Sequence, residues 1–568
     1  MKNSEIAGIF YEIADMLEMQ DVEFKPRAYR KAAQNIESLQ RDIEEIYKEG
    51  KLEDIPGVGR HIAEKIKELI ETNHLKYYEK LKSSIPVDLE ALGSIEGLGP
   101  KTIKKLYKQL KIKNLKDLEN ALRQGKLKKL EGFKEKKIQN IIENIDFAKK
   151  SRQRFLLGFA LPEAEAIKEE LKKLKEVEKI KIAGSIRRMN ETIGDIDILA
   201  AATQAEKVMD AFTGQKEVEK VFAKGPTKSS VRLKSGIQVD LRIIPKEVFG
   251  SALQYLTGSK PHSIKLRKIA MQKKLKLSEY GLFRNNKIIA GKTEEELYNK
   301  LGMPYIEPEL REDAGEIEAA LEKKLPKIVK YNEILGDLQM HTEYSDGNNT
   351  IKEMAEAAIG LGYKYIAATD HAGTLKIAGS MSTKQILKQK DEIEKLNKEL
   401  KNIHIIHGVE ANIMHDGSLD IDGNILKKMD LVIAAIHSGF KQQKDRITKR
   451  MLKAMDNRYV GIIAHPTGRI MQKRKGYEFE HGEIFQKAKD NDIALEINAF
   501  PNRLDLNCIG VREAIGHGVK LSIGTDAHSA EQLGYMRFGI ATARKGWAEK
   551  KDIINTYSLE DLKKFLDR

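Results

Sequence analysis

Cysteine is almost absent from this chain, which contains only Cys508 among its 568 residues. A single cysteine excludes disulfide bonds within the chain and fits a reducing compartment. The sequence also lacks an apolar run long enough to span a bilayer, and its first residues, MKNSEIAGIF, lack the apolar core of a signal peptide. We therefore expect a cytoplasmic protein with no membrane partner.

Negative charge is in deficit. Lys and Arg number 100 against 85 Asp and Glu, which gives a net charge of +15 and a pI near 9.2. This excess fits a polyanionic partner such as nucleic acid, although a lysine-rich solvated surface has the same composition. The chain is too long for one core, and about 100 to 200 residues per domain predicts three to five units.

The stretch GSIRRMNETIGDIDILA, residues 184–200, has the pattern of a strand, a polar loop and a second strand. Side chains alternate along a strand, so Asp195 and Asp197 share one face, with their Cα atoms about 7 Å apart. In GIQVDLRII the same alternation places Asp240 on a polar face. Three converging carboxylates suit a pair of Mg²⁺ ions in phosphoryl transfer, whereas a DxD pair alone is equally expected of a solvated strand.

Gly184 and Ser185 lie between the two predicted strands. Their backbone amides and hydroxyl can hold a triphosphate, with Arg187 and Arg188 neutralising its charge. Together, GSxRR, GDIDIL, VDLRIIP and QYLTGS resemble the palm of the family X DNA polymerases, in the nucleotidyltransferase superfamily. This resemblance implies that the catalytic residues binding Mg²⁺ or Mn²⁺ are Asp195, Asp197 and Asp240.

The same resemblance implies contacts to nucleotide and DNA. The residues around the incoming nucleotide would be Gly184, Ser185, Arg188, Tyr255, Gly258 and Ser263. Arg267 would lie near the templating strand. Two positions depart from the family pattern: Leu256 replaces an aromatic residue beside the tyrosine, and Ser263 replaces an asparagine that contacts the base. These departures put sugar discrimination and fidelity in question, and not the chemistry.

The amino-terminal third repeats a glycine turn between predicted helices. IPGVGRHIAEKI starts at Ile55 and IEGLGPKTIKKLY at Ile95, whereas a third copy from Leu130 lacks the second glycine and is interpreted as structural. One such turn is usually only a connector, but two indicate helix-hairpin-helix modules whose amides bind the phosphates of a duplex. The predicted DNA-binding residues here are Gly57, Gly59, Gly97, Gly99 and Lys101.

FKPRAYRKAA and the AEK that follows the first glycine turn resemble the lyase domain of eukaryotic family X repair polymerases. The resemblance implies that Lys65 is the catalytic amine that forms a Schiff base. Lys25 and Arg30 are candidate neighbours that would lower the pKa of this amine. The alternative is an ordinary lysine on a helix surface.

In the carboxy-terminal half, apolar strands end in metal-binding side chains, as at the active-site end of a TIM-like barrel. Sets of His and carboxylate suit Zn²⁺, Mn²⁺ or Fe²⁺, and bridging carboxylates allow two or three ions. The order of motifs resembles the PHP (polymerase and histidinol phosphatase) domain, a distorted (βα)7 barrel that hydrolyses phosphoesters. The resemblance implies the metal ligands His341, Asp346, His371, Glu410, His437, His465, Asp526 and His528. Gln339 departs from it, because a histidine usually stands there.

The predicted architecture is an all-α helix-hairpin-helix region, an α/β palm with a small thumb, and a TIM-like barrel. The predicted units are a lyase-like domain 1–82, a fingers-like domain 83–150, a palm 151–243, a thumb 244–312, a linker 313–334 and a PHP domain 335–568.

The resemblance as a whole implies a monomeric DNA polymerase that fills short gaps in base excision repair by two-metal nucleotidyl transfer. Its partners would be gapped or primer-template DNA and deoxynucleoside triphosphates. The PHP half would hold Mn²⁺ or Zn²⁺ and act as a 3′–5′ exonuclease, or as a 3′-phosphatase or abasic-site endonuclease. Two interpretations stay open: an inactive PHP scaffold for DNA or protein, and a small-molecule phosphoesterase with a degenerate polymerase.

Overall fold

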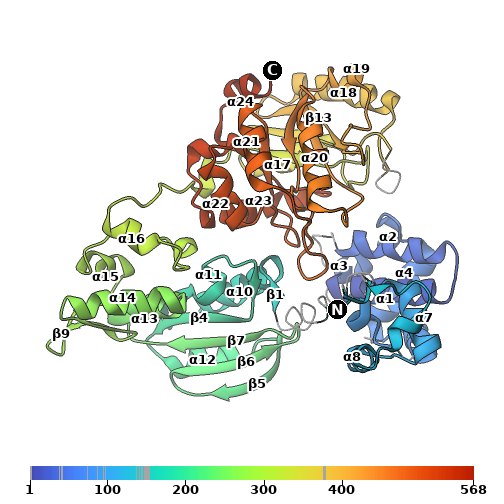
Figure 1. Ribbon diagram of the computed structural model, residues 1–568. Coiled ribbons are helices and arrows are strands. Elements are labelled where there is room, and N and C mark those ends of the chain that lie inside the picture. The colour runs from blue at the N-terminus through green and yellow to red at the C-terminus, as the bar shows by residue number, and fades with distance from the viewer. Residues whose placement is uncertain are drawn as a thin grey trace.

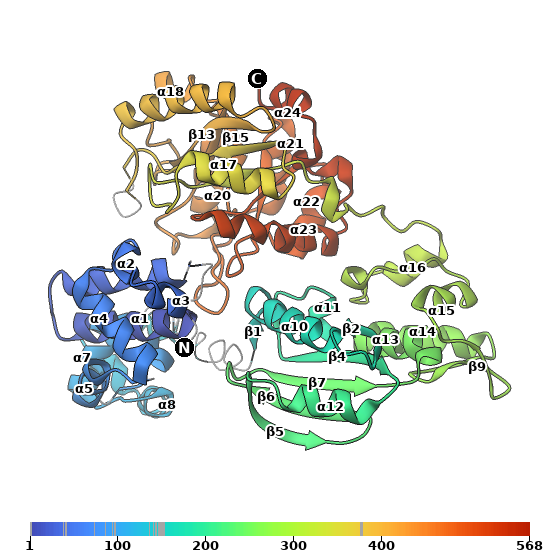
Figure 2. The same ribbon diagram turned by 180° about the vertical axis from the view of Figure 1, so that it is seen from behind.

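This computed structural model describes residues 3–37, 39, 43–72, 74–85, 87–93, 95, 98–135, 137–139, 141–142, 145, 154–374 and 379–567. The described residues form three lobes, seen from opposite sides in Figures 1 and 2. Their architecture confirms the predicted fold class. Among the described residues, no helix is both long and apolar enough to cross a membrane.

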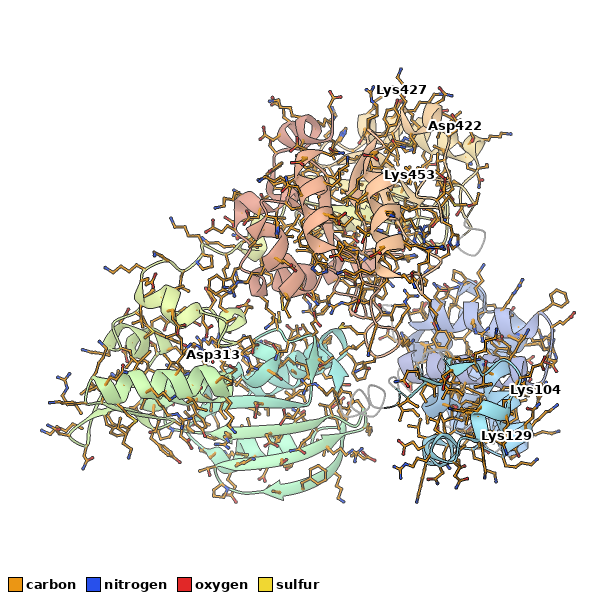
Figure 3. All side chains as sticks on the ribbon, viewed as in Figure 1. Lys104, Lys129, Asp313, Asp422, Lys427 and Lys453 are labelled. Carbon is orange, nitrogen blue, oxygen red and sulfur yellow. The ribbon has the colours of Figure 1, made fainter. Side chains whose placement is uncertain are left out.

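The described residues of the amino-terminal lobe form helices and connecting turns around one apolar core. Phe10 and Ile13 of the first helix are fully buried there, as helical spacing of apolar residues predicts. The elements of this lobe are α1 Asn3–Met19, α2 Lys25–Glu37, α3 Ile43–Lys48, η1 Leu52–Asp54, α4 Arg60–Thr72, α5 Lys76–Ser84, α6 Leu89–Gly93, α7 Pro100–Leu110, α8 Leu115–Arg123 and η2 Lys126–Lys129. Figure 3 labels Lys104 and Lys129 on it, two of the many side chains that reach solvent.

The palm contains a five-stranded mixed sheet of order β2-β4-β7-β6-β5, in which only β4 and β7 are parallel neighbours. Alternation along β4 buries Ile196 and Ile198 against α10 and α12, and Leu199 on the opposite face against α13. The elements are β1 Phe155–Leu156, α10 Leu157–Lys172, β2 Val177–Ile182, α11 Gly184–Arg187, β3 Thr192–Ile193, β4 Asp195–Ala202, α12 Ala205–Thr213, β5 Val218–Lys224, β6 Lys228–Leu233 and β7 Gln238–Ile243.

The thumb packs a short antiparallel sheet, order β10-β9-β8, against helices. Its elements are η3 Lys246–Val248, α13 Phe249–Thr257, α14 Lys260–Gln272, β8 Lys276–Ser278, β9 Gly281–Arg284, β10 Lys287–Ala290, α15 Glu294–Lys300, η4 Pro308–Leu310 and α16 Glu316–Leu321. Residues 313–334 differ from the predicted linker, because Ile317 and Ala320 of α16 are buried in the thumb core. The connection proper, 322–334, contains η5 Tyr331–Glu333.

The carboxy-terminal lobe has seven parallel strands in sequential order, β11 to β17. The first and last strands approach each other: the His341 amide donates to Ala527, and the Asn555 side chain bonds both Gly336 and Ile523. The strands are β11 Gly336–Met340, β12 Tyr365–Ala368, β13 His404–Asn412, β14 Leu431–Ala435, β15 Val460–Ile463, β16 Ala494–Asn498 and β17 Leu521–Gly524.

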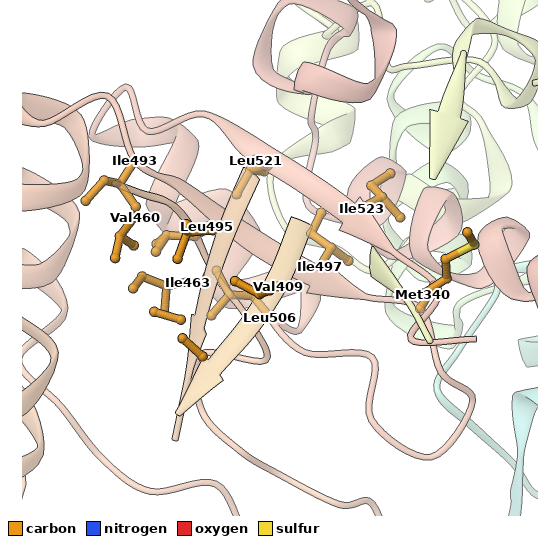
Figure 4. Close-up of a cluster of buried hydrophobic side chains, with 14 of the residues drawn as sticks. Met340, Val409, Val460, Ile463, Ile493, Leu495, Ile497, Leu506, Leu521 and Ile523 are labelled. Carbon is orange, nitrogen blue, oxygen red and sulfur yellow. The ribbon is translucent and has the colours of Figure 1, made fainter. Parts of the chain in front are cut away.

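Helices cover the outside of this barrel, and the side chains between strands and helices are apolar. Figure 4 shows part of that layer, including Val409, Ile463 and Ile523. The helices are α17 Ile351–Gly360, α18 Thr383–Glu399, α19 Gly423–Leu426, α20 Lys444–Met455, α21 His481–Asp490, α22 Cys508–Gly516, η7 Ala530–Tyr535, α23 Met536–Lys545, η8 Lys550–Asp552, η9 Ile554–Thr556 and α24 Leu559–Leu566.

The barrel and the palm share part of one core. Leu504 and Phe538 of the barrel lobe are buried within the palm's apolar cluster. Arg469 makes a two-pronged ion pair with Glu191 of the palm, with contacts of 2.6 and 3.1 Å. A shared core and a half-buried ion pair fix the carboxy-terminal lobe against the palm.

Candidate active sites

Two palm carboxylates are placed by the parallel pairing of β4 and β7. Asp197 stands directly opposite Asp240, and Asp195 lies two residues earlier on the same face. Gly184 closes one side of this site, because its φ is +66° and a Cβ on it would lie 2.5 Å from Asp197 Oδ2. Only glycine accepts this conformation and this approach without strain.

The electrostatics of the two opposed carboxylates differ. Burial, reinforced by the negative charges of Asp195 and Asp240, raises the pKa of Asp197 to about 6. Burial also raises the pKa of Asp240, but hydrogen bonds from Lys228, Ser230 and Gln238 outweigh it and leave this pKa below its usual range. Asp240 is therefore the weaker base of the two while Lys228 Nζ remains 2.7 Å from its Oδ2.

The two arginines of GSIRR have different partners. Arg188 lies beside the site, with Nε 3.0 Å from Glu312 and Nη1 donating to the carbonyl of Thr257. Arg187 turns into the thumb and pairs with buried Glu294 at 2.6 Å. The structure thus gives Arg187 a buried carboxylate partner that the sequence did not predict, and its role at a triphosphate stays a prediction.

The thumb side chains predicted at the nucleotide are dispersed. Gly258 lies close to Arg188, because a Cβ added to Gly258 would lie 3.4 Å from Arg188 Nη1. The Tyr255 side chain is 38% exposed. Ser263 is buried, with its hydroxyl 3.4 Å from the Gln254 amide, so the structure does not present it to solvent. Arg267 is exposed and its Nε donates to the Ser263 carbonyl at 3.2 Å.

The two glycine turns stand at helix starts. Gly59 directly precedes α4, and Gly99 is the N-cap of α7, whose first turn contains exposed Lys101, so both turns lie at helix N-termini, where the first backbone amides lack partners within the helix. Gly57 has φ +78° and packs on the second helix, where a Cβ would lie 3.0 Å from the Lys31 side chain. Gly97 lies outside the described residues.

Lys65 sits on α4 against Tyr77, with Nζ 5.1 Å from the ring centre and 3.0 Å from the His61 carbonyl. Burial lowers the pKa of Lys65, and the charge of Lys25 adds to this effect. Arg30 does not contribute as predicted, because it pairs with Asp15 and Glu18 instead. A lowered amine pKa favours nucleophilic attack.

The barrel brings all eight predicted metal-binding side chains to the carboxyl ends of its strands. Three overlapping groups have ligand atoms within 4.8 Å of one another: His341, Asp346, His371 and His528; His371, Glu410 and His437; His341, Glu410 and Asp526. The eighth, His465, places Nε2 3.2 Å from Glu410 Oε1. Glu410 is thus the carboxylate common to most of the cluster.

The donor set fits divalent cations. Nε2 of the buried His341 faces two carboxylates, Asp526 at 3.2 Å and Glu410 at 3.3 Å, and among the described residues neither of its ring nitrogens has a hydrogen-bond partner of good geometry. Ligand atoms that face a shared point rather than one another are typical of a metal site. Gln339 is the exception, since its amide Nε2 donates to Glu410 Oε2 at 3.1 Å.

Sequence reasoning missed Asp370, which precedes His371. Its carboxylate accepts bonds from Thr342, Ser345 and Gln389, so it fixes the loop that carries Asp346. Fixing a ligand through a second layer of hydrogen bonds is usual at metal sites. The TDH motif at the end of a strand was the available signal.

The fold and the two clusters define a class: a nucleotidyltransferase palm joined to a PHP metallohydrolase barrel. Family models match along the chain as a helix-hairpin-helix domain over residues 1–75, a SAM-like helix-hairpin-helix tandem over 89–146, a DNA polymerase beta thumb over 252–312 and a PHP domain over 337–500. A Bacillus subtilis protein named DNA polymerase/3′-5′ exonuclease PolX is 38% identical over 573 residues and covers all of both chains. The chain belongs to the family X DNA polymerases that carry a carboxy-terminal PHP domain.

Two further relatives each match one half. DNA polymerase lambda of Rattus norvegicus is 25% identical over 53% of this chain and 54% of its own. A protein of Thermoanaerobacter named a probable phosphatase is 30% identical over 39% of this chain and 89% of its own length.

Proposed function

We propose that the chain fills short gaps in DNA during repair and that its barrel removes nucleotides from the 3′ end. The observation that carries the first part is the register that sets Asp197 opposite Asp240 beside Arg188. Carboxylate oxygens suit Mg²⁺ or Mn²⁺, and the repulsion that raises the pKa of Asp197 is what a cation would relieve.

In this mechanism Asp195, Asp197 and Asp240 hold two ions, which when bound neutralise the phosphate charge and the leaving pyrophosphate. Arg188 and the Ser185 hydroxyl orient the triphosphate. Asp240 accepts the proton of the primer 3′-hydroxyl once the ion pair between Lys228 and Asp240 has opened. Most of the rate comes from positioning and charge neutralisation.

The barrel cluster fits a metal-dependent exonuclease, and the B. subtilis relative carries that activity in its name. Glu410 and the seven histidine and carboxylate side chains around it would hold Mn²⁺ or Zn²⁺, which when bound would activate water for phosphoester hydrolysis. The glycine turns would bind the phosphates of the DNA backbone, and Lys65 would act as the lyase amine. Both roles suit a substrate with a gap at an abasic site. A cytoplasmic monomer remains the prediction from the sequence.

The test is a time course on a 5′-labelled primer in a one-nucleotide gap carrying a 5′-phosphate, with Mn²⁺, in the presence and absence of nucleotides. Lengthening with nucleotides and shortening without them support both activities. Asp526→Ala should abolish shortening and leave lengthening, and Asp240→Asn should do the reverse. If shortening survives Asp526→Ala, the exonuclease does not reside in the barrel.

A second candidate function is a barrel that serves as a scaffold without chemistry. The position of Gln339 favours it, because the amide fills a ligand position and donates to Glu410 instead of binding a cation. Purified protein free of bound transition metal, combined with no shortening of the primer, would support this alternative.

A further inference from the structure

The loop that follows α11 carries Arg188 and leads to the catalytic strand β4. Arg188 is only 11% exposed, and Glu312, at the end of the thumb, is its carboxylate partner. Figure 3 labels the next residue, Asp313, between the thumb and palm helices. A one-to-one pair between Arg188 and Glu312 would carry no net charge, which is a poor arrangement for binding a triphosphate.

A second cation prevents that neutralisation. Lys545, the last residue of α23 in the carboxy-terminal lobe, is 7% exposed and lies 2.9 Å from the same Oε1 atom of Glu312 that Arg188 contacts. Its ammonium also donates to the Arg188 carbonyl at 3.1 Å and to Asn190 Oδ1 at 2.9 Å. An ammonium has three donors, and these three acceptors use all of them.

The arrangement therefore combines two cations and one anion, with a net charge of +1. The arginine backbone and the carboxylate are held by one ammonium from a helix 357 positions away in the sequence. Arg469 holds the same loop at Glu191, so the barrel lobe contacts it at successive residues. This loop is consequently built from both lobes.

We propose that Lys545 is a positioning residue of the polymerase site: it keeps Glu312 from neutralising Arg188 and fixes the arginine's backbone for the incoming triphosphate. The PHP lobe thereby sets nucleotide affinity by a contact remote from its metal cluster. The inference rests on the proposed role of Arg188 in binding the triphosphate.

The experiment measures the apparent Kd for the incoming nucleotide by single-turnover extension across a one-nucleotide gap, in the full-length protein. Lys545→Met should raise this Kd about tenfold, the loss expected for one hydrogen bond to a charged group. The maximal extension rate should stay within about twofold, since catalytic groups are untouched. Shortening of the primer without nucleotides should be unchanged.

Charge restoration separates this role from a structural one. In Lys545→Met/Glu312→Gln the net charge returns to +1, so the Kd should recover to within about threefold of the wild type. Lys545→Arg should recover similarly. A double variant no better than Lys545→Met overturns the proposal, as does an unchanged Kd in Lys545→Met itself.

Arg537→Met is the matched control, because Arg537 lies at the other end of α23 and pairs with Glu165 of the palm at 2.9 Å. It should leave the Kd unchanged, and an equal rise would show that docking of the lobes, not Lys545, sets the affinity. Arg188→Met tests the foundation. If it leaves the Kd unchanged, the nucleotide-site assignment fails; if it raises the Kd while Lys545→Met does not, only this inference fails.

Discussion

Asp197→Asn should stabilise the metal-free protein while abolishing nucleotide incorporation. Asp197 is a half-buried member of a group of three carboxylates, and its pKa rises from 3.8 to about 6 through burial and the charges of Asp195 and Asp240. At about 1.4 kcal/mol for each tenfold change in proton affinity, the ionised carboxylate costs about 3 kcal/mol at neutral pH. An asparagine of the same shape removes this cost.

The pH dependence has a definite sign. The folded protein binds the Asp197 proton more tightly than the unfolded chain, so between pH 3.8 and about 6 the folded state holds a proton that the unfolded state has lost. The free energy of unfolding of the wild type therefore falls as pH rises through this window, and the cost is complete above it. The advantage of Asp197→Asn should be greatest at neutral pH and should disappear near pH 4.

The assay is thermal unfolding in a chelator, followed for the transition that includes the palm. A gain of about 3 kcal/mol corresponds to a rise of about 6 to 12 °C in Tm for a cooperative unit of about 150 to 250 residues, such as the palm together with the thumb. Mg²⁺ or Mn²⁺ should raise the Tm of the wild type and not of the variant, because ligands that bind only the folded state stabilise it. Asp210→Asn, an exposed acid on α12 paired with Lys224, is the control and should shift the Tm little. An unchanged or lower Tm for Asp197→Asn in chelator would refute the account of the site as a group of mutually repelling carboxylates.

Three further predictions concern single positions. Gly184→Ala should lower the extension rate about a hundredfold, because its Cβ displaces Asp197, while primer shortening persists; equal extension would contradict the close approach. Lys65→Ala should abolish borohydride trapping on a 5′-deoxyribose phosphate, whereas Lys67→Ala, on the same helix and paired with Glu71, should not; trapping by both variants would exclude Lys65 as the amine. Gln339→His should add about one bound divalent ion per protein by elemental analysis, and an unchanged metal content would show that the amide leaves no ligand position open.

The clustering of the three palm carboxylates was predictable because strand alternation is a local property. DIDIL and VDL place acids and apolar residues on opposite faces whatever surrounds them, and the structure then pairs Asp197 with Asp240. The histidines of the barrel were predictable for the same kind of reason, since they follow apolar strands whose carboxyl ends meet. The helix-hairpin-helix turns were predictable because their glycines have a fixed spacing.

Other features depend on partners that the local sequence does not contain. Arg187 and Arg188 are neighbours in the motif, yet one pairs with buried Glu294 and the other with Glu312. Ser263 stands at a position expected to contact the base but is buried, and its hydroxyl accepts a hydrogen bond from Gln254 of α13. Residues 313–334 contain helix α16 in the thumb core, because its apolar side chains find a surface there.

The sequence by itself determined which chemical groups are present and how they are spaced: three palm acids, eight histidine and carboxylate side chains of the barrel, paired glycine turns and a net charge of +15. These follow from residue identity and from the two- and 3.6-residue periods of strand and helix. Only the tertiary structure decided which charges neutralise one another. Lys545 donates a hydrogen bond to the carbonyl of Arg188, 357 positions earlier in the sequence. Lys228 forms an ion pair with Asp240, and the Gln339 amide donates to Glu410. Ion pairs act over a few ångströms in space, and such distances are set by how the lobes pack.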